Sequence, residues 1–167
     1  MAITREEIEN LVAMDGVLLD DREFSKWLEL YQENCTYWMP AWDDDSDEQT
    51  SDPHKEISLI YYNSRAGLED RIYRIGTKRS SASKPLYRTT HMTSNLVVLE
   101  ADELSCSVRV SWVTYAYRHQ KSTSYFGNTV YKLVKVDGAL KIQSKRINLL
   151  NDYFEDVFNT LQIEHNI

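Results

Sequence analysis

The stretch that decides the fold is LSCSVRVSWVTYAYR, residues 104–118. Val108, Val110 and Trp112 alternate along it with Arg109 and Ser111. An alternation of apolar and polar side chains is typical of a strand in a sheet with one buried face and one wet face. The stretch therefore predicts a long strand of an antiparallel sheet.

Further segments of the second half share this β-rich character and are separated by short polar breaks. They are RTTHMTSNLVVLE at 88–100, SYFGNTVYKLVKV at 124–136 and ALKIQSKRINLL at 139–150. Asp137 and Gly138 stand between the last two segments, and an Asp-Gly pair is a preferred two-residue hairpin turn. The second half is therefore predicted to form a meander of long antiparallel strands.

Helical signals dominate the first half of the chain. Thr4 and Glu7 have the spacing of a capping box, and Ile8, Leu11 and Val12 follow with the helical repeat. Two more helices are predicted, in DDREFSKWLELYQ at 20–32 and in RAGLEDRIYRI at 65–75. Short strands are predicted in CTYWM at 35–39 and EISLIYY at 56–62.

Helices followed by a meander of strands predict an α+β fold, in which a long curved antiparallel sheet wraps around the N-terminal helices. The sequence contains no internal repeat, no low-complexity tract and no linker between domains. A length of 167 residues suits one hydrophobic core. We therefore expect a single domain over residues 1–167.

The composition excludes some classes of function. A formal net charge of −7 disfavours nucleic-acid binding, because phosphate recognition needs a basic surface. No apolar run approaches the roughly 20 residues of a membrane-spanning helix, and the acidic N-terminus lacks the order of a secretory signal. Cys35 and Cys106 are therefore predicted to be buried thiols in a reducing cytoplasm.

The segment YWMPAWDDDSDE at 37–48 passes from aromatic to acidic residues and raises the question of a cation site. The aspartates at 43, 45 and 47 match the first three ligand positions of an EF-hand loop. However, Glu48 stands where that loop needs glycine, and His54 stands where it needs a bidentate glutamate. The pattern favours a strand that ends at Pro40 in a solvated acidic loop over a weak cation site.

Iron sites are the next candidates, because the chain has 2 Cys and 4 His. A Rieske cluster needs a histidine two residues after one cysteine and three after the other. Cys35 is followed by TYW and Cys106 by SVR, so this cluster is excluded. His54 and Glu56 have the His-x-acid form of a mononuclear iron triad, to which His91 or His119 would add a distal imidazole. No second feature supports this triad, and a surface histidine is the favoured interpretation of His54.

Acid–base chemistry without a metal is a further hypothesis. Asp15 lies on the apolar stripe of the first predicted helix and His91 lies within a predicted strand, so burial could tune the pKa of both groups. They would then serve a stand-alone lyase or isomerase. The favoured alternative is structural: Asp15 pairs with an arginine or caps a turn, and His91 is a hydrogen-bonded core or interface residue. The motifs of serine hydrolases and dinucleotide-binding proteins are absent from the sequence.

Several long blocks resemble a known family. They are YWMPAWDDD at 37–45, DPHKEISLIYY at 52–62, RAGLEDRIYRI at 65–75 and RTTHMTSN at 88–95. In this order they resemble the small (beta) subunit of bacterial aromatic-ring-hydroxylating dioxygenases, and most of all the benzoate, toluate and anthranilate branch. The likeness extends over nearly the whole chain and is looser around 92–102 and after Asp156.

The resemblance implies a fold and a role. The implied fold is the cone-shaped α+β fold shared with ketosteroid isomerase and scytalone dehydratase. The implied role is that of a non-catalytic structural subunit, which assembles with other beta subunits and with an alpha subunit as a hetero-hexamer of three alpha and three beta chains. The alpha subunit would hold the Rieske 2Fe-2S cluster and the mononuclear Fe(II), and would convert an aromatic acid such as benzoate with O2 and NADH-derived electrons. This chain is then expected to hold no catalytic residue, cofactor or metal.

Arginine and tyrosine enrichment suggests where the partner subunits bind, because subunit interfaces bury aromatic side chains and pair arginines with carboxylates. The predicted interface residues are Trp38, Tyr61, Tyr62, Arg65, Arg71, Arg74, Arg79, Arg88 and His91. The alternative is that half of them form ion pairs within the chain. The sequence does not determine which aromatic acid the enzyme prefers or whether this subunit tunes that preference.

Overall fold

The computed structural model describes residues 3–43, 45–76 and 85–152. Its helices are α1 (Arg5–Asp20), α2 (Phe24–Leu28) and α3 (Arg65–Gly76). Its strands are β1 (Tyr31–Pro40), β2 (Trp42–Asp43), β3 (Glu48–Gln49), β4 (Ser58–Tyr62), β5 (Arg88–Ala101), β6 (Ser105–Arg118), β7 (Lys121–Val136) and β8 (Ala139–Leu149). None of the helices in these ranges is long and apolar enough to cross a membrane.

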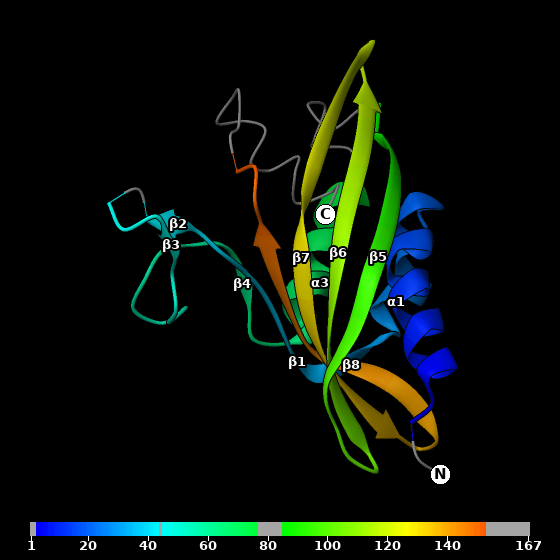
Figure 1. Ribbon diagram of the computed structural model, residues 1–167. Coiled ribbons are helices and arrows are strands. Elements are labelled where there is room, and N and C mark those ends of the chain that lie inside the picture. The colour runs from blue at the N-terminus through cyan, green and yellow to red at the C-terminus, as the bar shows by residue number, and fades with distance from the viewer. Residues whose placement is uncertain (1–2, 44, 77–84, 153–167) are drawn as a thin grey trace.

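The main sheet has the strand order β4-β1-β8-β7-β6-β5. Its neighbours are antiparallel, as predicted, except that β1 and β8 pair in parallel. The long strands curve strongly, with α3 behind the sheet and α1 along the side of β5 (Figure 1). We call the face that packs on the helices the inner face and the opposite one the outer face. The α+β prediction of helices packed on a long curved sheet is confirmed.

The helix α1 begins where the capping box predicted it. The Thr4 side chain accepts a hydrogen bond from the Glu7 backbone N–H, and the Glu7 carboxylate accepts one from the Thr4 N–H at 2.8 Å. The buried side of α1 then presents Ile8, Leu11 and Val12 to the inner face. Because these side chains recur with the helical repeat, the local pattern and the tertiary packing select the same element.

The predicted hairpin turn at Asp137 and Gly138 is confirmed. Both residues have positive φ, 50° and 83°, and Val136 pairs with Ala139 across the turn. Positive φ at both central residues is the geometry of a type I′ turn, which matches the twist of the flanking strands. This turn sets the register between β7 and β8, and so decides which side chains of β8 face the helices.

The predicted second helix over 20–32 is wrong in its extent. The helix α1 runs through Asp20, Arg22 turns the chain with a φ of 59°, and α2 covers only Phe24–Leu28. Tyr31 already belongs to β1, because its backbone pairs with Ile142 of β8. Strand pairing with a segment more than 100 residues away overrides the local helical preference of this stretch.

Candidate functional site

The strongest candidate for chemistry is Asp15, which is 2% exposed at the centre of the inner face. Its Oδ1 accepts hydrogen bonds from Trp27 Nε1 and from the Tyr31 hydroxyl, both at 2.8 Å. Its Oδ2 accepts from the Tyr131 hydroxyl at 2.8 Å and from Lys145 Nζ at 2.7 Å. Each carboxylate oxygen therefore has two donors, which come from α2, β1, β7 and β8.

The electrostatics of this group favour the charged forms of Asp15 and Lys145. Burial raises the pKa of Asp15, but the Lys145 charge and the hydrogen bonds outweigh burial, so the pKa of Asp15 is lowered. For Lys145, burial lowers the pKa and the Asp15 charge more than compensates, so its pKa is raised. Burial and the adjacent Asp15 charge raise the pKa of Tyr31 and Tyr131 well above 10. Asp15 Oδ2 and Lys145 Nζ thus form a buried ion pair at 2.7 Å, and Lys145 is the partner of Asp15 rather than the predicted arginine.

A cavity next to Asp15 has a volume of about 30 Å³ and is also lined by Gly16, His91, Trp112 and Tyr131. This volume corresponds to about one water molecule, whereas small-molecule sites usually measure at least about 300 Å³. A general base also needs a free lone pair within reach of its substrate. The arrangement therefore stabilises the packing of helices on the sheet, and it does not favour the lyase or isomerase hypothesis.

His91 lies on β5 and binds Asp20 at the end of α1. Its Nδ1 is 2.5 Å from Asp20 Oδ1, its backbone N–H donates to Asp20 Oδ2 at 2.8 Å, and Thr89 Oγ1 also donates to Asp20. Burial raises the pKa of Asp20, and the hydrogen bonds from His91 outweigh it, so that pKa is lowered. Gly16 permits this approach, since a Cβ there would lie 2.8 Å from His91 Cβ. His91 is thus a hydrogen-bonded residue of the inner face, as the structural alternative predicted.

The predicted interface residues do not form one surface. Trp38 and Tyr61 are register partners at the β4 edge, and the Arg146 guanidinium carbon lies 4.7 Å from the centre of a Trp38 ring. Arg88 lies at the opposite edge, where its guanidinium carbon is 5.3 Å from the Tyr117 ring centre. Because β4 and β5 are the two edges of the sheet, Tyr61 and Arg88 are separated by its full width, and three strands lie between Trp38 on β1 and Arg88 on β5.

Of the remaining predicted interface residues, some lie in the core and others lie on the surface of α3. Tyr62 packs near Tyr37, and Arg71 is only 5% exposed over the same ring. Arg65 forms ion pairs within the chain, at 2.9 Å with Glu69 and 3.7 Å with Glu33, as the alternative interpretation proposed for part of the set. Arg74 is exposed, and Arg79 lies outside the described residues. Which of these residues contact a partner stays a prediction.

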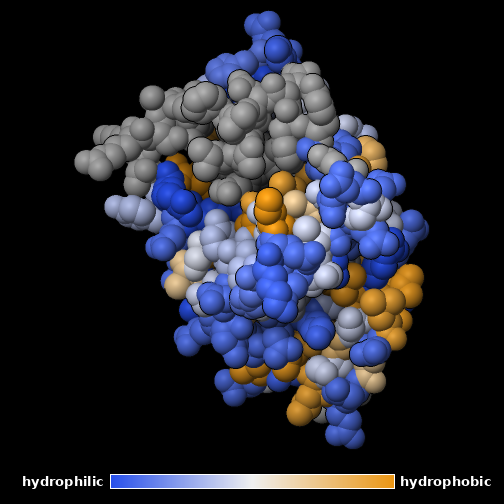
Figure 2. All heavy atoms as spheres, turned by 90° about the vertical axis from the view of Figure 1, so that its left-hand side faces the viewer, coloured by the Kyte–Doolittle hydropathy of each residue, from blue (hydrophilic) through white to orange (hydrophobic). Residues whose placement is uncertain are grey.

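The acidic segment forms the short β2–β3 hairpin. Asp43 Oδ1 accepts from the Asp45 N–H at 2.9 Å, and the Glu56 carboxylate accepts from the backbone N–H groups of Ser51 and Asp52 at 2.6 Å. These carboxylates thus stabilise the turns of their own loop by accepting hydrogen bonds from its backbone. The molecular face that carries this hairpin is mostly hydrophilic (Figure 2). In the described ranges no three or more His, Cys, Asp or Glu residues gather as a metal site would require.

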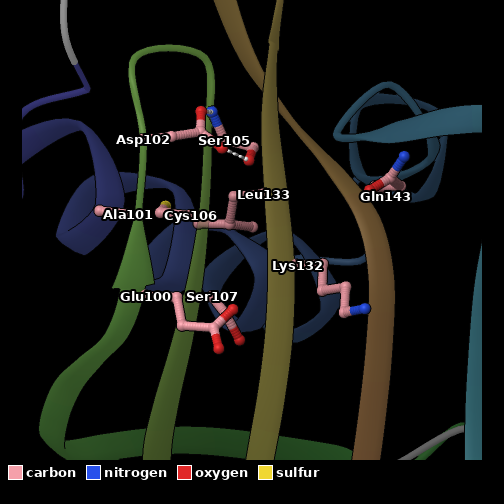
Figure 3. Close-up of a pocket in the computed structure, with 9 residues that line it drawn as sticks. All are labelled: Glu100, Ala101, Asp102, Ser105, Cys106, Ser107, Lys132, Leu133 and Gln143. Atoms are coloured by element: carbon pink, nitrogen blue, oxygen red, sulfur yellow. Dashed lines mark hydrogen bonds between the residues drawn. The ribbon is translucent and has the colours of Figure 1, made fainter.

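A larger hollow of about 410 Å³ lies near the β5–β6 turn and is lined by residues including Glu100, Asp102, Ser105 and Lys132 (Figure 3). The Asp102 carboxylate is engaged by the turn, because it accepts hydrogen bonds from the backbone of Leu104 and Ser105 and from Ser105 Oγ. These bonds lower the pKa of Asp102, the Ser105 hydroxyl contributing most. The carboxylate therefore stabilises the turn rather than serving the hollow as a free ligand.

The sequence prediction identified Asp15 but missed the four donors around it. Each donor points to the inner face from its own helix or strand. The one sequence signal that could have revealed a donor is Lys145, which occupies a position of an alternating strand where an apolar residue is expected. A buried lysine needs a carboxylate partner, and Asp15 was the one acidic residue assigned to an apolar stripe. Pairing these two residues from sequence would have required the register of β8.

Comparisons with known proteins place the chain in a family. Residues 15–156 match the family model described as ring hydroxylating beta subunit. The benzoate 1,2-dioxygenase subunit beta of Acinetobacter baylyi is 44% identical over 96% of this chain and 95% of its own. The crystal structure of the benzoate 1,2-dioxygenase beta subunit from Burkholderia mallei is 39% identical, covers 95% of this chain and 98% of its own, and has a TM-score of 0.79.

A more distant likeness bears on the fold alone. A scytalone dehydratase-like protein from Novosphingobium aromaticivorans has a TM-score of 0.65 at 16% identity, over 90% of this chain and 88% of its own. The predicted cone-shaped fold is thereby confirmed. With a family model that covers most of its length and a relative that is 44% identical, the chain belongs to the ring hydroxylating beta subunit family.

Proposed function

We propose that this chain is the non-catalytic small subunit of a multicomponent dioxygenase of the benzoate 1,2-dioxygenase type. Its role is to assemble, as a single cytoplasmic domain, with other beta subunits and with a larger alpha subunit in a hetero-hexamer of three alpha and three beta chains. The alpha subunit would dihydroxylate an aromatic carboxylic acid such as benzoate with O2 and NADH-derived electrons. The observation that carries this proposal is the likeness to a benzoate dioxygenase beta subunit over nearly the whole of both chains.

The filled interior supports a structural role. The carboxylate best placed for chemistry, Asp15, accepts four hydrogen bonds and faces room for about one water molecule. Its ion pair with Lys145 joins α1 to β8, one of the two central strands of the sheet. A group held in this way contributes rigidity and specificity to the fold rather than turnover.

The described residues do not fit the iron groups of such an enzyme. Cys35 lies on β1 and Cys106 on β6, with β8 and β7 between them. At about 4.8 Å per strand the two cysteines are roughly 14 Å apart across the sheet, too far for one iron–sulfur cluster. We therefore assign the Rieske cluster and the mononuclear iron to the alpha subunit.

Native mass spectrometry with iron analysis tests the proposal. The full chain is purified alone and after co-expression with the large-subunit gene encoded beside it. We expect iron only in the co-expressed sample, in an equimolar complex of the two chains. Stoichiometric iron in the chain alone, or a chain that never binds its large neighbour, would contradict the proposed role.

A further inference from the structure

The small cavity on the inner face is lined by two side chains that each carry an unpaired polar atom. It is the cavity of about 30 Å³ next to Asp15, and both His91 and Trp112 line it. His91 Nε2 and Trp112 Nε1 are buried, and neither atom has a hydrogen-bond partner among the residues that the structure describes. A buried polar atom without a partner destabilises a fold, so most such atoms bind protein groups or ordered water. The two atoms therefore need an explanation.

The other tryptophans show that the indole N–H of Trp112 is an exception in this protein. The chain has 4 Trp. The other three, Trp27, Trp38 and Trp42, each donate a hydrogen bond to an oxygen of the protein at 2.6, 2.8 or 2.9 Å. An indole N–H is a donor only and cannot be satisfied by a second donor. Trp112 therefore requires an acceptor at the cavity.

The contact between His91 and Asp20 determines what the other unpaired atom can do. His91 Nδ1 lies 2.5 Å from Asp20 Oδ1. The pKa of Asp20 is lowered, mainly by the hydrogen bonds from His91, so its carboxylate is ionised and can only accept. In the neutral imidazole the proton therefore lies on Nδ1, and Nε2 keeps its lone pair as an acceptor. The two atoms at the cavity are thus one donor, on Trp112, and one acceptor, on His91.

The register of the sheet brings both side chains within reach of one small molecule. His91 pairs with Thr114 across β5 and β6, and Thr93 pairs with Trp112, so His91 and Trp112 are diagonal neighbours. Diagonal neighbours are about 7–8 Å apart, a distance that aromatic side chains can span. A cavity of this size holds about one water molecule, and a buried water makes about three hydrogen bonds. Thr93 and Thr114 also line the cavity, and a threonine hydroxyl can supply the third bond.

We propose that this cavity is a binding site for one structural water molecule, which accepts a hydrogen bond from Trp112 Nε1 and donates one to His91 Nε2. The water extends a chain of hydrogen bonds from Asp20, at the end of α1, through His91 on β5 to Trp112 on β6. It does not depend on Asp15, whose two oxygens already have four donors. An apolar ligand of the same size would leave both polar atoms unpaired. The inference concerns this chain alone and is independent of the proposed assembly role.

The test is a crystal structure of the wild-type chain, alone or in complex with the large subunit, at a resolution that shows ordered water. A second data set is collected under xenon pressure, because xenon enters dry apolar cavities. We expect one water peak within about 2.7–3.2 Å of both Trp112 Nε1 and His91 Nε2, and no xenon in the cavity. Xenon in the cavity, or ordered side chains without a water peak between them, would overturn the inference.

Solution NMR of the wild-type chain tests the direction of the hydrogen bonds. We expect the Trp112 indole proton to show cross-relaxation with a long-lived water. The Trp42 indole, which donates to the Leu149 carbonyl, is the matched control and should show none. Long-range proton–nitrogen spectra of the neutral His91 ring should place its proton on Nδ1. A proton on Nε2, or a Trp112 indole that behaves like that of Trp42, would overturn the inference and would leave the test of the proposed function unaffected.

Discussion

The two faces of the sheet differ in which side chains they bury and which they expose. The inner face buries a charged pair, Asp15 and Lys145, and satisfies the carboxylate with further donors from Trp27, Tyr31 and Tyr131. The outer face leaves large apolar side chains in contact with solvent. A protein can bury polar groups when each has a partner, and it exposes a contiguous apolar surface when the partner is another molecule. Substitutions on the inner face should therefore change the stability of the fold more than substitutions on the outer face.

The largest effect is expected from Asp15→Asn. The substitution keeps the shape of the side chain but leaves Lys145 charged and buried without a counter-charge. Removing one partner of a buried ion pair costs about 3–5 kcal/mol, which urea unfolding would measure. The double variant Asp15→Asn/Lys145→Met is the control, because it removes both charges, and we expect it to be more stable than the single variant. If the two variants are equally unstable, the uncompensated charge of Lys145 is not the cause of the lost stability.

A smaller effect is expected from Tyr131→Phe, which removes one donor to Asp15 while keeping the ring near Lys145. Hydrogen bonds to charged groups contribute about 1.5–3 kcal/mol, so the free energy of unfolding should fall by that amount. Tyr115→Phe is the matched control, since Tyr115 is exposed on the outer face. Equal losses from both variants would contradict the distinction between the two faces.

Acid should weaken the contact between α1 and the sheet. Hydrogen bonds from Lys135 and from the Thr4 backbone lower the pKa of Glu7 from 4.5 to about 2. A carboxylate with a depressed pKa stabilises the fold above its unfolded pKa, and this contribution disappears as the pH falls from about 4.5 to about 2. We expect the stability difference between the wild type and Glu7→Gln to shrink over that window in unfolding experiments. Glu6→Gln, in the same helical turn, provides the comparison, and a difference that is independent of pH would contradict this assignment.

The smallest effect on stability is expected from Met92→Ser. Met92 is 54% exposed, and substitutions at exposed positions usually change stability by less than about 0.5 kcal/mol. Thermal unfolding would measure this value. A loss comparable to that of Tyr131→Phe would show that Met92 packs within its own chain, and it would remove the contrast between the faces.

Much of the fold was predictable because its signals are local. The capping box at Thr4, the alternation around Val110 and the turn at Asp137–Gly138 each lie within a few residues, and all are confirmed. The prediction of a helix over 20–32 was wrong because Tyr31 pairs with Ile142 in the sheet, and this long-range pairing overrides the helical preference of the neighbouring residues. The partner of Asp15 was missed for the same reason, since Lys145 is 130 positions away.

The sequence by itself determined the family, the α+β class and the order of helices and strands, because these depend on local periodicity and on long blocks of residues read in order. Only the tertiary structure decided which groups meet. It placed Asp15 and Lys145 together on the inner face, put β8, β7 and β6 between Trp38 and Arg88, and aligned Met92 with Phe126 on the outer face. The physical reason is that register and strand order are set by pairing between distant segments, and a shift of one residue would move every side chain of a strand to the other face.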